Sequence, residues 1–114
     1  MEFRPSKHIA INVKDYEQAV SFYRDVLGWE LVKYTERESQ FKKGDANYFI
    51  ADDPTRAYAV FFEYEVDDID AAKAFLESSG CTVREVYGPH SIMFTDPHGT
   101  NFHIYQKGTP LPEL

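Results

Sequence analysis

The sequence has few of the features that mark secreted, membrane-spanning or nucleic-acid-binding proteins. Its single cysteine, Cys81, cannot form an internal disulfide, so we expect a small, partly buried thiol in a reducing compartment. There is no apolar run approaching about 18 residues and no basic-then-apolar segment at the start. These absences predict a cytoplasmic protein that does not enter a membrane.

Basic residues are also scarce. The 114 residues hold 12 Lys or Arg against 19 Asp or Glu, and residues 58–114 hold only 3 basic side chains against 9 acidic ones. A nucleic-acid-binding protein needs an electropositive stripe, so no nucleic-acid partner is expected. The six glycines are scattered, which excludes a phosphate-cradling loop. Neither Ser91 nor Cys81 lies in a recognisable nucleophile motif.

Aromatic residues, in contrast, are abundant. They make up 16% of the chain within a hydrophobic fraction of 43%. A chain of this length and composition is expected to fold as one globular domain over residues 1–114. So many aromatic rings in a small domain suggest that some of them line a pocket as well as the core.

The most informative stretch lies near the C-terminus. Residues 96–99, Asp-Pro-His-Gly, have turn chemistry, because Asp can cap the turn, Pro presets φ and Gly accepts a positive φ. After the turn the residues alternate, with Asn101, His103 and Tyr105 on one face and apolar residues on the other. This period of two predicts a half-buried strand that presents His103 on its polar face.

The chain contains a repeated unit. Residues 13–19 resemble residues 66–72, and in both cases a clean strand precedes the segment and helical spacing follows it. We expect helices that begin near Tyr16 and Ile69 and stop near Gly28 and Gly80. The expected strands are residues 7–13, 29–35, 37–44 and 47–51 in the first half and about 59–66, 82–87, 90–95 and 101–106 in the second. The sequence thus predicts an α+β fold of two β-α-β-β-β modules, about residues 7–52 and 59–106.

Strand alternation also predicts which side chains line a cleft shared by the two modules. The apolar faces should pack under the helices, which leaves the opposite faces to the cleft. By this phase the cleft residues are His8, Ala10, Asn12, Tyr48, Ile50, Phe61, Glu63, Glu65, Asn101, His103 and Tyr105. A slip of one residue inverts any strand's set, and Phe49 is the alternative to Tyr48.

Four segments resemble the vicinal oxygen chelate superfamily, which contains glyoxalases, bleomycin resistance proteins and extradiol dioxygenases. They are His8-Ile9-Ala10-Ile11-Asn12-Val13, Phe22-Tyr23-Arg24-Asp25-Val26-Leu27-Gly28-Trp29, residues 65–72 (Glu-Val-Asp-Asp-Ile-Asp-Ala-Ala) and residues 94–99 (Phe-Thr-Asp-Pro-His-Gly). The resemblance spans about residues 7–106. It implies paired modules in an open, curved sheet around the shared cleft, commonly assembled as a homodimer.

The resemblance also implies a ligand set for one divalent metal ion. Carried over by position, the ligands would be His8 and Tyr48 from the first module and Phe61 and His103 from the second. The sequence departs from the family pattern here: His103 stands where glutamate is usual, and Phe61 has no metal-binding atom. Glu63, two residues from Phe61, is the candidate to complete a two-histidine, one-carboxylate set.

Other roles remain open for the same residues. His8 and His103 are alternatively pocket-lining, hydrogen-bonding histidines without a metal. Glu63 is the candidate catalytic base, with a solvated strand end as the alternative. The candidate ligand-binding residues are Tyr48, Phe61, Asn101 and Tyr105, which could instead fill space between the modules.

Three functions follow from these alternatives. The first is a protein that binds an organic small molecule in the intermodule cleft, with an incomplete metal-ligand set. The second is a divalent-metal-dependent lyase or dioxygenase that uses His8 and His103. The third is a non-catalytic regulatory or assembly module.

Overall fold

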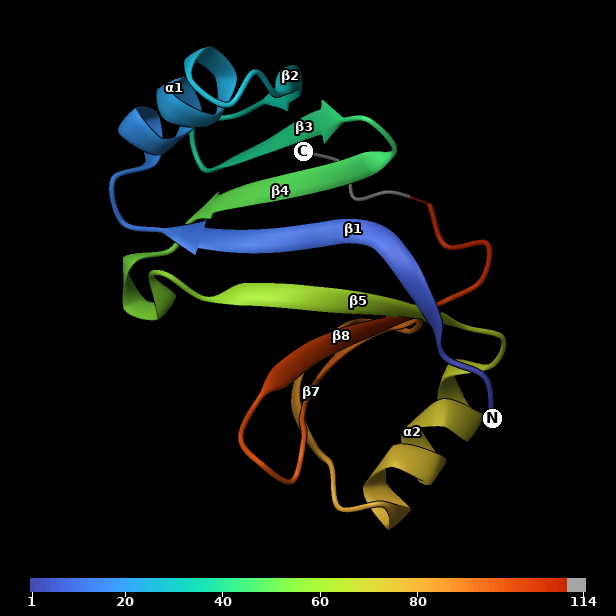
Figure 1. Ribbon diagram of the computed structural model, residues 1–114. Helices are drawn as coiled ribbons and strands as arrows, with labels where there is room; N and C mark the ends of the chain where they lie inside the picture. Colours follow the sequence, from blue (N-terminus) through green and yellow to red (C-terminus); the bar gives the residue numbers. More distant parts are fainter. Residues whose placement is uncertain (111–114) are drawn as a thin grey trace. The chain divides into compact units, whose positions relative to one another are not determined.

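Within the described part of the chain, two α-helices and eight strands follow one another in a repeated order (Figure 1). The computed structural model describes residues 1–110. The first half contains β1 (Arg4–Val13), α1 (Tyr16–Asp25), β2 (Glu30–Tyr34), β3 (Glu38–Lys43) and β4 (Ala46–Asp52). A short 3₁₀ helix, η1 (Pro54–Arg56), leads to β5 (Val60–Val66), α2 (Ile69–Ser78), β6 (Thr82–Gly88), β7 (Ser91–Thr95) and β8 (Asn101–Gln106). The predicted α+β class and β-α-β-β-β repeat are confirmed, and the first strand begins three residues earlier than expected.

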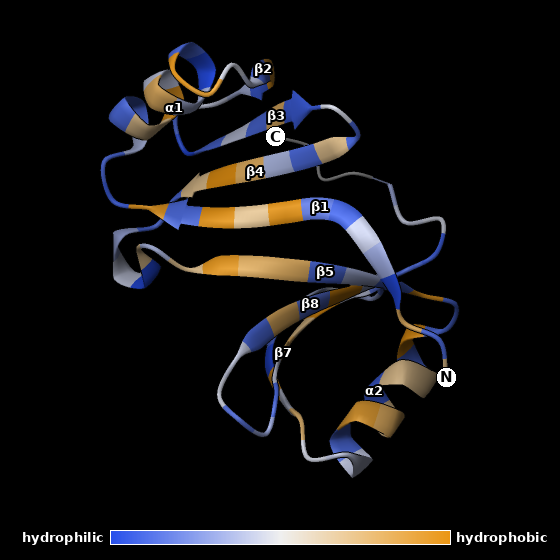
Figure 2. Ribbon diagram, in the orientation of Figure 1, coloured by the Kyte–Doolittle hydropathy of each residue, from blue (hydrophilic) through white to orange (hydrophobic). Residues whose placement is uncertain are grey.

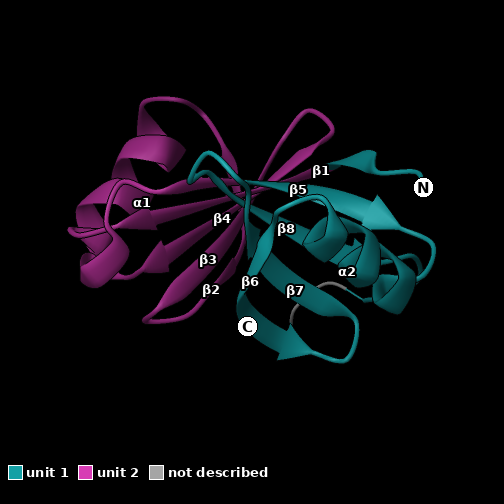
Figure 3. Cartoon of the chain, turned by 90° about the horizontal axis from the view of Figure 1, so that it is seen from below, with its two compact units in different colours: residues 1–6, 62–111 teal, residues 7–61, 112–114 magenta. Residues whose placement is uncertain are grey.

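The chain divides into two compact units (Figure 3). Unit 1 comprises Met1–Ser6 and the described residues from Phe62 onward, and unit 2 comprises Lys7–Phe61. In unit 2 the strands run in the order β2-β3-β4-β1, with β1 and β4 parallel and the other pairs antiparallel. In unit 1 the order is β5-β8-β7-β6, again with one parallel pair, β5 and β8.

Unit 2 has its own hydrophobic core under α1. The core residues Tyr16 and Val20 of α1 pack with Phe41 and Ile50, which are fully buried. The four-residue spacing of Tyr16 and Val20 places both on one face of the helix, so burying that face holds α1 to its strands. The Tyr16 hydroxyl bonds to Ser39 and to the Thr35 carbonyl, which satisfies its polar end inside the core.

Unit 1 repeats this arrangement with α2. Ile69, Ala72 and Leu76 form the buried face of the helix and pack against Phe94 and Ile104. Asp68 caps the helix start, because its carboxylate accepts hydrogen bonds from the backbone N–H groups of the first turn. Figure 2 shows hydrophobic and hydrophilic residues mixed along both helices, as the amphipathic spacing predicts.

The predicted turn between β7 and β8 is confirmed. Asp96 Oδ1 accepts hydrogen bonds from the backbone N–H groups of His98 (2.8 Å) and Thr100 (3.0 Å). Gly99 has a φ of 95°, a backbone angle that residues other than glycine rarely adopt. His98 is exposed in this turn. The turn therefore sets the register of the β7–β8 hairpin from Thr95 and Asn101 inward.

None of the helices within residues 1–110 is long and apolar enough to cross a membrane.

Candidate functional site

The strand register gathers polar side chains on one face of unit 1. Glu63 of β5 pairs with His103 of β8, and Glu65 pairs with Tyr105 in the same parallel ladder. On the other side of β8, Ser91 of β7 pairs with Tyr105. Because paired residues on neighbouring strands project to the same side of a sheet, these five side chains share one face. We call this face, defined by Glu63, Glu65, Ser91, His103 and Tyr105, the polar face of unit 1.

A hydrogen-bonded chain runs across the polar face through the ring of His103. Nδ1 of His103 lies 3.1 Å from Glu63 Oε1, and Nε2 lies 2.5 Å from Ser91 Oγ. The His103 and Glu63 side chains are only 16% and 11% exposed. A carboxylate only accepts hydrogen bonds, so Glu63 selects the tautomer with the proton on Nδ1. In this tautomer Nε2 accepts from the Ser91 hydroxyl.

Two tyrosines flank this chain. The ring of Tyr87 meets that of His103 edge-on, with centroids 5.4 Å apart, and the ring of Tyr105 lies at 6.4 Å. The Tyr105 hydroxyl donates to Ser6 Oγ at 3.1 Å. Burial raises the pKa of Tyr105, so its hydroxyl stays neutral at physiological pH. The imidazole thus sits between polar partners and two aromatic rings.

Glu65 has a different environment from Glu63. The Arg4 guanidinium donates to Glu65 Oε1 at 3.0 Å and to Asp67 Oδ1 at 2.9 Å. Glu65 thus has Arg4 as an ion-pair partner. Of the two carboxylates considered as bases, Glu63 is the one that contacts the histidine.

The other predicted residues are spread over both units. Asn101 is half-buried, and its Oδ1 accepts from the Thr95 hydroxyl at 2.6 Å. Phe61 is 6% exposed. His8 belongs to unit 2, where it pairs with Asn47 across β1 and β4 and meets the ring of Phe49 edge-on at 5.7 Å.

The predicted side of β4 for Tyr48 is wrong. Tyr48 pairs with Ile9 rather than with His8, and its ring stacks on Trp29 at 3.8 Å in the core under α1. Ile50 shares that buried face. Phe49, the one-residue alternative, lies on the face of β4 that carries Asn47, the partner of His8. Tyr48 therefore packs, half-buried, against the core under α1, because stacking on Trp29 fixes the phase of the strand.

Unit 2 has a polar group of its own. Nε2 of Gln40 donates to Asn47 Oδ1 at 3.3 Å, and Asn47 pairs with His8. Gln40 is only 4% exposed, and its Oε1 is buried without a hydrogen-bond partner within residues 1–110. This group consists of amides and one imidazole, whereas the polar face of unit 1 carries carboxylates.

Sequence reasoning missed Ser91 and Tyr87 as members of the site. The signal for Ser91 was present in the hairpin: with Thr95 opposite Asn101 at the turn, counting back along both strands places Ser91 opposite Tyr105. The irregular register between β6 and β7 hides the position of Tyr87 from such counting.

The polar face of unit 1 does not supply a complete metal centre by itself. A site of this type needs about three protein ligands with free lone pairs. Within residues 1–110, no group of three or more His, Cys, Asp or Glu side chains comes together. His103 directs both ring nitrogens to Glu63 and Ser91, and Phe61 has no ligand atom. What the donor set of the polar face offers is hydrogen bonding and proton transfer.

Sequence comparisons identify a protein family and a relative whose sequences resemble this chain. The sequence model of the Glyoxalase/Bleomycin resistance protein/Dioxygenase superfamily matches residues 6–104. The chain is 32% identical to the uncharacterized protein YaeR of Escherichia coli (strain K12), and the match covers 88% of this chain and 94% of that protein.

Solved structures with low sequence identity share the fold. Homoprotocatechuate 2,3-dioxygenase from Arthrobacter globiformis superposes with a TM-score of 0.76 at 23% identity, covering 99% of this chain and 39% of the dioxygenase. The hypothetical protein BH1468 from Bacillus halodurans C-125 gives a TM-score of 0.71 at 12% identity, covering 98% of both chains. A superfamily member from Vibrio splendidus 12B01 gives 0.66 at 19% identity, covering 93% of this chain and all of that one. At these identities the likeness concerns the fold alone.

Proposed function

Because the chain belongs to the glyoxalase, bleomycin resistance protein and dioxygenase superfamily, we propose that it binds an organic small molecule at the polar face of unit 1. The observation that carries this proposal is the hydrogen-bonded chain from Glu63 through His103 to Ser91. Such a chain holds the Ser91 hydroxyl in one orientation, and its oxygen keeps lone pairs that can accept a hydrogen bond from a ligand hydroxyl. The neighbouring rings of Tyr87 and Tyr105 supply apolar contact.

Ligand-induced stabilisation tests this proposal. A ligand that binds only the folded protein raises its stability by about 2.7 kcal/mol at one hundred times Kd. A screen of hydroxylated and carbonyl-containing aromatic compounds should therefore contain molecules that raise the Tm. His103→Gln and Tyr105→Phe should reduce the rise.

Two matched variants serve as controls. His98→Gln changes an exposed turn histidine, and Tyr58→Phe changes a tyrosine that is 80% exposed in unit 2. Both should keep the full rise. If the controls lose as much of the shift as His103→Gln and Tyr105→Phe, the ligand does not contact the polar face.

Proton transfer is a second candidate function, favoured by the contact between Glu63 and Nδ1 of His103. A half-buried carboxylate and an imidazole can together remove a proton next to a carbonyl group of a bound ligand. A stabilising ketone from the screen, incubated with the protein in D₂O, should then lose its α-proton NMR signal. Glu63→Gln should abolish this exchange while the ketone still raises the Tm.

The metal-dependent alternative makes a different prediction. A divalent-metal-dependent lyase or dioxygenase using His8 and His103 would retain a stoichiometric divalent ion after purification. The ion would be lost in both His8→Ala and His103→Ala. Elemental analysis of the three proteins distinguishes this alternative from the binding proposal.

We further propose that residues 1–114 form one domain and that the protein is a homodimer. Light scattering coupled to size-exclusion chromatography measures the molar mass directly. A mass close to 13.2 kDa, that of one chain, would reject the dimer.

A further inference from the structure

A separate groove lies on the helix side of unit 1. It has a volume of about 430 Å³, within the range of small-molecule sites. Its lining includes four aromatic rings, one apolar helix residue and one carboxylate: Phe3, Phe62, Tyr64, Phe102, Leu76 and Asp96. No lysine, arginine or histidine lines it.

The aromatic rings of the groove come from three segments of the chain. Phe62 and Tyr64 are two residues apart on β5 and so project to the same side, and Phe62 pairs with Phe102 of β8. Tyr64 and Phe102 meet edge-to-face with centroids 6.0 Å apart. Phe102 also stacks on the fully buried Phe94 at 6.0 Å. The rings are thus held by the core beneath them.

Phe62 distinguishes this groove from an ordinary core edge. It is 58% exposed, although the other rings provide an apolar surface beside it. Its ring lines the groove together with those of Tyr64 and Phe102, which is the composition of an open aromatic box. Such boxes recognise methylated ammonium groups, because the negative faces of the rings attract a positive charge that is weakly hydrated.

The carboxylate of Asp96 adds a fixed negative charge. Its Oδ1 accepts hydrogen bonds from the backbone N–H groups of Thr100 and His98. These bonds lower the pKa of Asp96, so the group is ionised at neutral pH. The described part of unit 1 carries nine Asp or Glu side chains and four Lys or Arg, and Arg4 is already paired with Glu65 and Asp67. The surroundings thus favour a cationic ligand over an anionic one.

We propose that this groove binds an organic cation with a quaternary or methylated ammonium group, held over the rings of Phe62, Tyr64 and Phe102 and attracted by Asp96. A primary ammonium is a weaker candidate because it loses more hydration on entering an aromatic box. The site is separate from the one proposed at the polar face, so either can fail without the other.

The test compares choline with 3,3-dimethylbutan-1-ol, a neutral molecule of the same shape, by NMR titration of the full-length protein. We expect saturable chemical-shift changes for choline. The neutral molecule should bind at least about tenfold more weakly. Absence of choline binding, or equal affinity for both molecules, overturns the proposal.

Variants locate the site. Phe62→Ala removes an exposed ring and should weaken choline binding about fivefold. Asp96→Asn keeps the Oδ1 acceptor of the turn and removes only the charge, so it should weaken binding while the fold is preserved.

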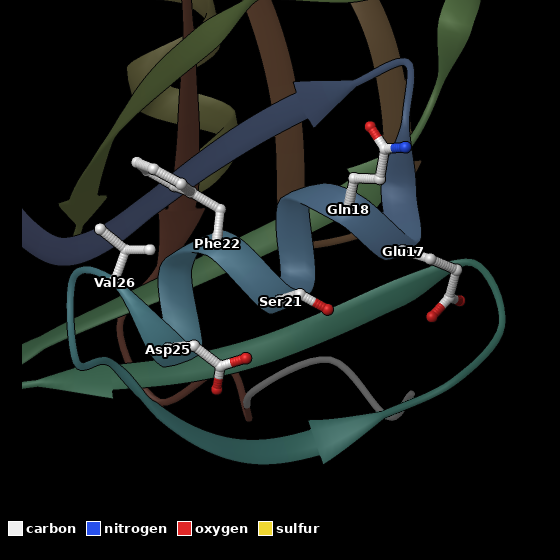
Figure 4. A pocket seen from close by; sticks show the side chains of 6 residues that line it. All are labelled: Glu17, Gln18, Ser21, Phe22, Asp25 and Val26. Carbon is white, nitrogen blue, oxygen red and sulfur yellow. The ribbon is translucent and has the colours of Figure 1, made fainter.

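The chain offers a matched control for each substitution. Phe22 of α1 is 48% exposed. It lines a shallow pocket together with the carboxylates of Glu17 and Asp25, and no second aromatic ring lines that pocket (Figure 4). Asp53 caps another turn by accepting from the backbone N–H of Arg56. Phe22→Ala and Asp53→Asn should leave choline binding unchanged. Equal losses in the controls would show that choline responds to negative charge or exposed rings in general, which would also overturn the proposal.

Discussion

The two units share a backbone plan and differ in the polar pairs that their parallel strands carry. In each unit the first and last strands pair in parallel, and a residue of one faces a residue of the other. In unit 2 the facing pair is His8 and Asn47, and the next polar contact leads to the amide of Gln40. In unit 1 the pair is Glu63 and His103, and the next contact leads to Ser91.

The repeat therefore determines the backbone arrangement of each unit but not the side chains on its polar positions. Strand order, parallel pairing and the helix over the core are the same in both units. The side chains on the polar positions are not. Amides hydrogen-bond but do not release protons at neutral pH, whereas a carboxylate, an imidazole and a hydroxyl can pass one along. The chemistry proposed for this protein therefore depends on unit 1.

The largest expected effect tests whether the units unfold as one domain. Phe94 in unit 1 and Phe41 in unit 2 are both fully buried, and truncating either to alanine should cost about 3–5 kcal/mol of unfolding free energy. Trp29, the single tryptophan, belongs to unit 2 and reports on it. If there is one domain, Phe94→Ala shifts the urea midpoint seen by Trp29 fluorescence as far as the midpoint seen by circular dichroism.

Independent unfolding would give the opposite pattern. Phe94→Ala would leave the Trp29 transition unchanged, while Phe41→Ala would move it. Such a result would show that the two units are separate folding domains.

A smaller effect should distinguish the two polar pairs. Glu63→Ala removes the partner of a half-buried His103 and should cost about 1–3 kcal/mol, because the ring N–H loses a charged acceptor. Asn47→Ala removes a neutral hydrogen bond from Gln40 and should cost about 0.5–1.5 kcal/mol. Urea denaturation of both variants measures the difference. Equal costs would contradict the view that the pair in unit 1 is the stronger one.

Much of this architecture could be predicted from the sequence. The turn at residues 96–99 and the alternation after it identify β8 and its polar face, because Pro and Gly restrict the backbone locally. The two amphipathic helices are equally clear, and each lies within the range expected for it. These features depend on near neighbours in the chain.

The errors come from contacts between distant residues. β4 contains Tyr48, Phe49 and Ile50 in succession, so alternation alone does not choose its buried face. The stacking of Tyr48 on Trp29, nineteen residues away in the chain, makes the choice. The contact between Ser91 and His103 likewise forms across a hairpin, so it emerges only when both strands are counted back from the turn.

The smallest predicted effects have opposite signs in the two units. Hydrogen bonds from Thr100 and His98 lower the pKa of Asp96 in unit 1, so its ionisation stabilises the fold above the ordinary carboxyl pKa of about 3.9. Burial raises the pKa of Glu38 in unit 2. Its favourable contribution is present below the ordinary pKa of about 4.3 and is lost as the pH rises through the folded value.

Two variants measured against pH test these signs. At pH 7, Asp96→Asn should destabilise the protein and Glu38→Gln should stabilise it. Both differences from the wild type should shrink as the pH falls through the carboxyl range. If both variants changed the urea midpoint in the same direction relative to the wild type at pH 7, the two carboxyls would not differ as described.

The most direct measurement of the central claim is the imidazole ¹⁵N NMR spectrum of the four histidines, with His103 assigned from His103→Gln. The account predicts a His103 ring protonated on Nδ1, whose signals change in Glu63→Gln and Ser91→Ala and move when a stabilising ligand from the screen binds. The signals of His98 should stay in place throughout. A His103 ring protonated on Nε2 alone, or one that no stabilising ligand affects, would contradict the assignment of the functional site to the polar face of unit 1.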